Sequence, residues 1–148
     1  MKIFTNLSNF KSINKTFVTI GTFDGVHIGH QKVIKNLIKS AEKNKKTAVL
    51  LTFFPHPRMV LQNKVDIKLI NTIEERTQLL KNLGLNILVI QEFSTKFANL
   101  TALEFVKTIL VNTLNISRLV IGYDHHFGKN REGNFKQLEH YGHTYNFK

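Results

Sequence analysis

Cysteine is absent from the sequence, and proline occurs only twice. A chain without thiols can form neither a disulfide framework nor a thiolate-ligated metal site. No apolar run approaches the roughly 20 residues that a membrane-spanning helix needs. Residues 1–6 also lack the apolar core of a secretory signal peptide. We therefore expect a cytoplasmic protein that has no membrane partner.

Acidic residues are scarce as well, because 10 Asp and Glu stand against 21 Lys and Arg, a net charge of +11. Such a surface attracts anions, including nucleic acid and phosphorylated small molecules. The lysines are scattered apart from one dense run at residues 43–46, and no basic stripe is interleaved with aromatic residues. The pattern favours a surface that attracts polyphosphates and predicts no specific nucleic-acid partner, although a nucleic-acid-binding module remains an alternative.

The 148 residues fit one domain that is large enough to bury a core. Apolar runs predict strands at residues 17–20, 47–54, 86–90 and 118–121, and helical periodicity or capping boxes predict helices that begin near residues 29, 72, 101 and 134. Strands that are apolar on both faces and alternate with amphipathic helices predict an α/β fold with a doubly wound parallel sheet. We expect an irregular loop at 56–70 and the start of a fifth strand at 143–148.

The segment after the first predicted strand is rich in glycine and histidine and reads Gly21-Thr22-Phe23-Asp24-Gly25-Val26-His27-Ile28-Gly29-His30. Its glycines allow a tight turn and close approach to a ligand, and the helix that begins near Gly29 offers free amides and a positive dipole end to an anion. His27 and His30 are three residues apart, so both can project from the helix start and stabilise charge on a phosphate. We predict a nucleotide-binding loop.

Other interpretations of this loop are weaker. It contains neither the Gly-Lys-Ser/Thr of a P-loop nor the G-x-G-x-x-G of a dinucleotide site. A zinc site at His27 and His30 would need a third ligand, which no spacing dictates. The remaining alternative is a glycine-rich strand–helix turn in which the two histidines are incidental.

The second predicted strand ends in Pro55-His56-Pro57, which contains both prolines of the chain. Two prolines around one residue give a stiff, extended exit from the strand. Such a segment can form one wall of a pocket, and Phe53 and Phe54 could supply aromatic surface for a flat ring. Alternatively, the prolines merely end the strand.

A third polar segment, residues 122–133, follows the fourth predicted strand. Asp124 stands at the strand exit, where it could accept a ribose or ring donor or bind a metal ion, and Lys129 and Arg131 could meet phosphates. We interpret His125 and His126 as surface residues rather than metal ligands. Ligands of doubly wound sheets bind where the strand order reverses, so the first and third segments meet there if their strands are neighbours.

Three motifs together resemble the FMN adenylyltransferase module of the bacterial bifunctional riboflavin kinase/FAD synthetase family. They are Gly-Thr-Phe-Asp-Gly-Val-His-x-Gly-His-Gln at 21–31, Thr-Phe-x-Pro-His-Pro at 52–57, and Gly-x-Asp-x-x-Phe-Gly at 122–128. The resemblance implies a Rossmann-like nucleotidyltransferase fold of the HxGH type. It also implies transfer of AMP from ATP to FMN, giving FAD and pyrophosphate, with Mg²⁺ assisting.

The resemblance also assigns site residues. His27 and His30 match the catalytic histidines that contact the ATP phosphates. The implied ATP side further comprises Gly21, Thr22, Phe23, Asp24, Gly29, Gly122 and Tyr123. The implied flavin side comprises Phe54, Pro55, His56, Pro57, Asp124 and Phe127. No protein metal site is implied.

The chain departs from the family pattern in two ways. His125 and His126 stand where Phe and Arg are frequent, and nothing matches the downstream strand, the Ser-Ser/Thr-x-Ile-Arg segment or the riboflavin kinase domain. We therefore expect residues 1–148 to form one adenylyltransferase-like domain that lacks its last strand and helix and has no kinase activity. The alternatives are a nucleotidyltransferase with another phosphate acceptor and a non-catalytic flavin or nucleotide sensor. The sequence does not indicate the oligomeric state.

Overall fold

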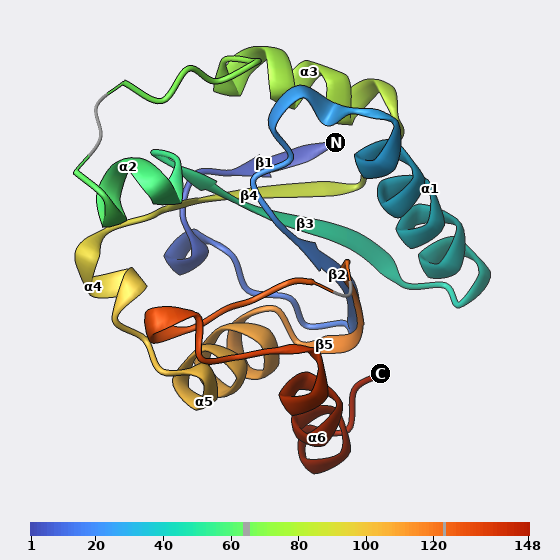
Figure 1. Cartoon of the computed structure of the whole chain (residues 1–148). Helices are drawn as coiled ribbons and strands as arrows, with labels where there is room; N and C mark the ends of the chain where they lie inside the picture. The colour runs from blue at the N-terminus through green and yellow to red at the C-terminus, as the bar shows by residue number, and fades with distance from the viewer. Residues whose placement is uncertain (64–65, 123) are drawn as a thin grey trace.

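Five parallel strands form the centre of the computed structural model, which describes residues 1–63, 66–122 and 124–148. The strands are β1 (Lys2–Phe4), β2 (Thr16–Ile20), β3 (Thr47–Phe54), β4 (Ile87–Glu92) and β5 (Ile116–Val120). Their order in the sheet is β1-β4-β3-β2-β5, and every neighbouring pair is parallel (Figure 1). This arrangement confirms the predicted α/β class.

Helices cover both faces of the sheet (Figure 1). One face carries α1 (Ile28–Lys43) and α3 (Ile73–Asn82). The other carries α5 (Ala102–Glu104), which continues as the π-helix η3 (Phe105–Thr113), and α6 (Phe135–Tyr145). The remaining elements are α2 (Pro57–Leu61), α4 (Thr95–Ala98), η1 (Leu7–Asn9), η2 (Asp24–Val26) and η4 (Lys129–Arg131).

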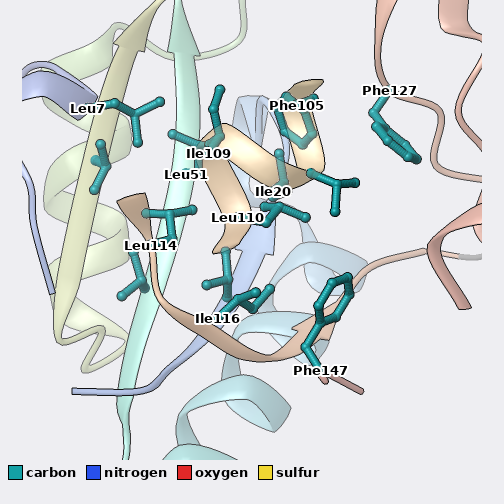
Figure 2. Packing of buried hydrophobic residues seen from close by; sticks show 14 of the residues in the cluster. Leu7, Ile20, Leu51, Phe105, Ile109, Leu110, Leu114, Ile116, Phe127 and Phe147 are labelled. Carbon is teal, nitrogen blue, oxygen red and sulfur yellow. The ribbon is translucent and has the colours of Figure 1, made fainter. Parts of the chain in front are cut away.

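The β3 strand shows why the sequence folds in this way. Its central residues alternate between the two cores: Ala48 and Leu50 pack with α1, whereas Val49 and Leu51 pack with η3. All four are fully buried, which explains a continuous apolar run in place of the alternation of a half-exposed strand. Figure 2 shows the core on the η3 side, where Leu51 lies among side chains from β2, η3 and the C-terminal segment.

The structure differs from the sequence analysis in three segments. The strand β1 was not predicted, because three residues at a sheet edge are too few to show a pattern. The segment 56–70, expected to be irregular, contains α2. The expected strand at 143–148 is wrong, because α6 continues to Tyr145 and ends where Asn146 adopts a positive φ of 59°. Only Lys148 pairs with β5, through bonds to Ser117 and Leu119 of 3.0 and 2.7 Å.

The direction of the strand order changes between β2 and β5. From β2 the chain proceeds through β3 to β4 on one side, and then crosses to place β5 on the other side of β2. Thr19 of β2 pairs with Val120 of β5, so the segments that begin at Gly21 and Gly122 leave the sheet side by side. The neighbouring strands required by the sequence argument are therefore confirmed, and the crevice where such sheets bind ligands lies between these exits.

Candidate active site at the carboxyl edge of the sheet

The loop after β2 has an unusual backbone. Phe23, Gly25 and Val26 all have positive φ values, of 51°, 74° and 41°. Glycine adopts this region freely, but a bulky or β-branched residue does so at a cost of roughly 1–3 kcal/mol and only where its surroundings enforce it. Phe23 and Val26 are both buried, which provides that enforcement. The core beneath the loop therefore contributes to holding this conformation.

This backbone brings His27 and His30 together at the start of α1. Their rings stack with centroids 3.6 Å apart and planes inclined by 26°. His27 caps the helix, and its Nδ1 accepts a long hydrogen bond of 3.4 Å from the His30 N–H. A Cβ at Gly29 would lie 3.1 Å from the His27 ring, so the glycine makes room for it. Two imidazoles thus stand at the positive end of a 16-residue helix.

The surroundings of the His30 ring favour its neutral form. Burial lowers its pKa below the ordinary value, the neighbouring His27 lowers it further, and Asp24 opposes the shift. Its Nδ1 is buried without a hydrogen-bond partner among the described residues, and the Phe23 and His30 rings pack edge to face with their centroids 5.1 Å apart. A neutral imidazole with an unused nitrogen can bind a phosphate oxygen through an N–H, and a bound polyanion would favour its protonation.

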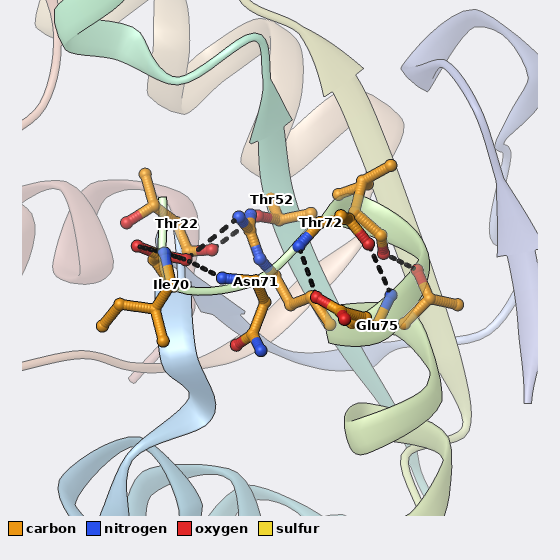
Figure 3. A network of polar contacts seen from close by, with 10 residues as sticks. Thr22, Thr52, Ile70, Asn71, Thr72 and Glu75 are labelled. Carbon is orange, nitrogen blue, oxygen red and sulfur yellow. Dashed lines mark hydrogen bonds and ion pairs between the residues drawn. The ribbon is translucent and has the colours of Figure 1, made fainter. Parts of the chain in front are cut away.

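Asp24 has partners that the sequence did not indicate. Its carboxylate accepts hydrogen bonds from the backbone N–H groups of Ile70, at 3.0 and 3.1 Å, and Asn71, at 3.1 Å (Figure 3). Arg76 of α3 lies 3.6 Å from the same carboxylate. Although partial burial alone would raise the pKa of Asp24, these donors and Arg76 hold it below its usual value. Asp24 therefore ties the loop to the segment before α3.

The second segment begins with a cis Phe54–Pro55 peptide bond. His56 then caps α2, because its Nδ1 accepts a hydrogen bond of 3.2 Å from the Arg58 N–H, and Pro57 begins that helix. Burial lowers the pKa of His56, and Arg58 adds to this effect. His56 is thus a half-buried ring whose neutral form is favoured.

The two phenylalanines before Pro55 face opposite sides of the sheet. Phe53 packs with Phe93 and Phe97, at centroid distances of 5.6 and 5.5 Å, on the face that also carries Phe127. Phe54 lines a cavity of about 700 Å³ on the α3 face with residues of β1, β4 and α3. Phe54 and Phe127 therefore lie on opposite faces of the sheet, because adjacent strand residues alternate between faces, and their grouping on the flavin side stays a prediction.

The third segment is attached through an apolar anchor. Phe127 is only 7% exposed, and its ring packs on Phe105 at 5.6 Å. Phe127 also pairs with Gly133, where a Cβ would lie 2.5 Å from the Phe127 ring. Gly128 has a φ of 76° and lies against the backbone of Ala102. The Phe127 ring therefore fixes the loop rather than presenting a free face to a ligand.

Polar residues of the same segment lie nearer to solvent. Asp124, Lys129 and Arg131 are exposed, whereas His125 is half-buried and burial lowers its pKa, with His126 adding to the shift. His125 is thus less exposed than the predicted surface residue. Tyr123, which the resemblance placed on the ATP side, lies outside the described residues.

Arg76 is the site residue that the sequence analysis missed. It is 2% exposed and lies within the stripe of α3 that Ile73, Thr77 and Leu80 also occupy. A charged residue at a core position of an amphipathic helix is the signal that could have identified it. Its partner, however, is 52 residues away in the sequence, and only the fold brings the two together.

The described residues contain no group of three or more His, Cys, Asp or Glu side chains that could hold a metal ion. The stacked histidines have no third ligand beside them within this part of the chain. The arrangement instead combines a helix start, two imidazoles and a strained loop beside the exit of β5. This geometry can bind a polyphosphate and orient it for attack by a second substrate in the crevice.

Known proteins resemble this chain over most of its length. The family model described as FAD synthetase matches residues 9–148. The bifunctional riboflavin kinase/FMN adenylyltransferase of Buchnera aphidicola subsp. Schizaphis graminum is 40% identical over 149 residues, covering 100% of this chain and 48% of that protein. Its namesake from Listeria monocytogenes is 40% identical over 131 residues, covering 87% of this chain and 41% of that protein. The chain spans about half the length of the curated relatives it matches.

A solved structure is also similar. A protein of Streptococcus pneumoniae described as a macrolide-efflux protein superposes with a TM-score of 0.83 at 30% identity, covering 95% of this chain and 47% of that one. Its description names efflux, whereas within residues 1–63, 66–122 and 124–148 no helix is long and apolar enough to cross a membrane. The family model and the curated relatives agree with each other, and on their evidence the chain belongs to the FAD synthetase family.

Proposed function

We propose that residues 1–148 form an adenylyltransferase unit that transfers AMP from ATP to FMN, giving FAD and pyrophosphate. The observation that carries this proposal is the stacked pair His27 and His30 at the start of α1, next to the exit of β5. Helix starts bind phosphates, and the reversal of strand order is where doubly wound sheets bind nucleotides. Membership of the FAD synthetase family supports FMN as the acceptor.

In this proposal ATP lies with its phosphates on the start of α1. The FMN phosphate oxygen attacks the α-phosphorus, a new phosphoanhydride bond forms, and the bond to the β-phosphate breaks to release pyrophosphate. No covalent enzyme intermediate is needed, so the protein contributes orientation and charge stabilisation. His27 and His30 stabilise the charge that develops on the phosphates by donating N–H groups. The nucleotide loop Gly21–Asp24 together with Gly29, Gly122 and Tyr123 forms the proposed ATP side.

The proposed flavin side lies across the crevice. It comprises Pro55, His56 and Pro57 at the exit of β3, and Asp124 in the loop after β5. Phe54, next to Pro55, belongs to this proposed side as well, and Phe53 supports it from the face that carries Phe97 and Phe127. The proposal thus keeps Phe127 as the anchor of the flavin-side loop.

Mg²⁺ belongs to the proposal as part of the ATP complex. The Asp24 carboxylate is already engaged by two backbone amides and Arg76, and no group of three potential ligands occurs among the described residues. Such a donor set suits an ion that is coordinated mainly by phosphate oxygens and water, as Mg²⁺ commonly is. When bound, the ion neutralises phosphate charge.

The names of the relatives also include a riboflavin kinase activity, which belongs to those longer proteins and is not assigned to this chain. We assign only adenylyl transfer to residues 1–148. The net charge of +11 supports this assignment, because a basic surface attracts the two anionic substrates.

A cytoplasmic location is also part of the proposal, because the reaction consumes ATP.

The test is chromatographic detection of FAD after the protein is incubated with MgATP and FMN. Parallel reactions replace FMN with riboflavin, which has no phosphate, or with nicotinamide mononucleotide, another phosphate acceptor. FAD formed from FMN alone supports the proposal. Product from nicotinamide mononucleotide but not FMN would identify a different nucleotidyltransferase, and a rise in thermal stability with ATP and FMN but no product would identify a sensor.

A further inference from the structure

Arg76 is a fully buried side chain that the proposed reaction does not touch. It is 2% exposed, and its terminal nitrogen lies 3.6 Å from an Asp24 oxygen. Its Nε is buried and has no hydrogen-bond partner among the described residues. A buried cation with one distant partner contributes little to stability, because desolvation offsets the attraction. Stability therefore does not account for an arginine at this position.

The partner of Arg76 belongs to the nucleotide loop. Besides Arg76, the Asp24 carboxylate holds the backbone amides of Ile70 and Asn71. These residues directly precede α3, whose N-terminus is fixed by a capping box between Thr72 and Glu75. Figure 3 shows the amides and the capping box as one continuous polar network. Through Asp24, the loop after β2 is thus attached to the first turns of α3.

The loop needs such an attachment. Phe23 and Val26, on either side of Asp24 and Gly25, are held in a left-handed conformation that neither residue favours. Phe23 in turn contacts the His30 ring, which stacks on His27. A loop that relaxed toward ordinary φ values would move Phe23 and, with it, the imidazole pair. The contacts therefore run from Arg76 through Asp24 and Phe23 to the two histidines.

We propose that Arg76 is a positioning residue for adenylyl transfer, which acts through Asp24 to hold the loop in the conformation that aligns His27 and His30 with the ATP phosphates. The inference rests on the proposed function and extends it to a residue on a different helix. Arg76 contacts Asp24, which belongs to the proposed ATP side, so we expect its main effect on ATP.

The main test compares Arg76→Met with Lys81→Met. Both changes remove one positive charge from α3, but Lys81 is exposed in the last turn, where it lines a hollow at the opposite edge of the sheet. For R76M we expect a fall in kcat of on the order of tenfold to 10²-fold, the scale of a small misalignment of reacting groups. We also expect a raised KM for ATP and an unchanged KM for FMN. K81M should retain wild-type kinetics.

The Arg76→Lys variant tests whether the positioning role needs the charge of Arg76 or the shape of its side chain. The ion pair in the structure is a single 3.6 Å contact rather than a bidentate one, so a lysine can replace the charge and should restore most of the activity. Thermal unfolding of R76M should stay close to that of the wild type, because methionine fills a similar volume without a buried charge. A wild-type kcat in R76M would overturn the inference, as would a loss that follows unfolding and is not rescued by R76K.

A measurement on the free protein separates this inference from the proposed function. The NMR signals of the His27 and His30 rings should shift in R76M and remain in place in K81M, whether or not the protein makes FAD. If the wild type makes no FAD but the rings shift, the proposed function fails and the positioning role stands. Unchanged ring signals in R76M would overturn the positioning role even in an active enzyme.

Discussion

The loop after β2 and the loop after β5 leave neighbouring strands, but different forces hold them. In the first loop, polar contacts add to the burial of Phe23 and Val26, since Asp24 binds two backbone amides and Arg76. An aromatic ring fixes the second, since Phe127 is buried against Phe105 and across from Gly133. Polar contacts are directional and contribute modestly to stability, whereas a buried ring contributes much more.

This difference in contacts predicts that the proposed reaction depends mainly on the first loop and the stability of the protein mainly on the second. Changes in the first loop should impair the reaction while the protein stays folded, because its contacts orient the histidines. Changes at the anchor of the second loop should mainly destabilise the protein.

Phe127→Ala should cost about 3 kcal/mol or more of unfolding free energy, the usual range for removing a buried phenylalanine. Urea unfolding measures this quantity. Phe54→Ala is the matched control, because Phe54 is 48% exposed and its loss should be clearly smaller. Equal losses for the two variants would contradict the assignment of Phe127 as an anchor.

His30→Ala should lower adenylyl transfer by roughly 10²-fold or more, the scale of losing one transition-state donor. Initial rates of FAD formation under saturating ATP and FMN measure it. Urea unfolding should change little, because His30 is only half-buried. His140→Ala, an exposed position on α6, serves as the control, and near-normal turnover by the His30 variant would refute the role assigned to that ring.

Gly29→Ala should reduce turnover by about tenfold, as a moderate misalignment would. The new Cβ would lie 3.1 Å from the His27 ring and displace it from its stack on His30. The same change should leave stability equal or higher, because alanine favours a helix by up to about 1 kcal/mol over glycine. Kinetics and urea unfolding of one variant therefore give opposite signs if the division is right. A loss of both turnover and stability in this variant would contradict the division.

A smaller effect concerns pH. Burial lowers the pKa of His30 in the first loop and of His125 in the second, and it also lowers that of His56. Because the unfolded chain then binds more protons, each histidine contributes stability that is complete above its unfolded pKa, about 6.5, and declines as the pH falls toward the folded value.

The urea concentration at the unfolding midpoint should accordingly decrease as the pH is lowered from 7.5 to 5.5. Replacing His30 or His125 by glutamine should in each case flatten the dependence, because burial lowers the pKa of both rings. A midpoint that rises on acidification would contradict the lowered pKa values. If only the His125 variant flattens the curve, the first loop is more open in solution than in the structure.

Much of the fold could be predicted because local patterns carry it. The apolar runs at β2, β3, β4 and β5 and the capping boxes before α3, α5 and α6 are short-range features, and the structure contains all of them. Failures occurred where no local pattern exists. The edge strand β1 depends on pairing with β4, and the end of α6 depends on the conformation of Asn146.

For the candidate site, the sequence indicated which residues could contact a phosphate, but it did not indicate which distant side chains would lie beside them. Glycine and histidine spacing identified the loop at 21–30, since a strand–turn–helix is a local unit in which residues three apart share a face. The same spacing could not show that Asp24 would meet Arg76, or that Phe53 rather than Phe54 would share a face with Phe127. Those outcomes depend on strand order and register, which long-range packing decides.

The residue types and their spacing alone thus predicted the strand–helix alternation, which the structure confirms, the family resemblance, and a phosphate-binding role for the loop at 21–30, which stays a prediction. The tertiary structure decided how the loop is held, on which face of the sheet each aromatic side chain lies, and that a buried arginine pairs with Asp24. The reason is physical: backbone and capping preferences act over a few residues, whereas an ion pair or a ring contact exists only after the sheet has brought distant segments together.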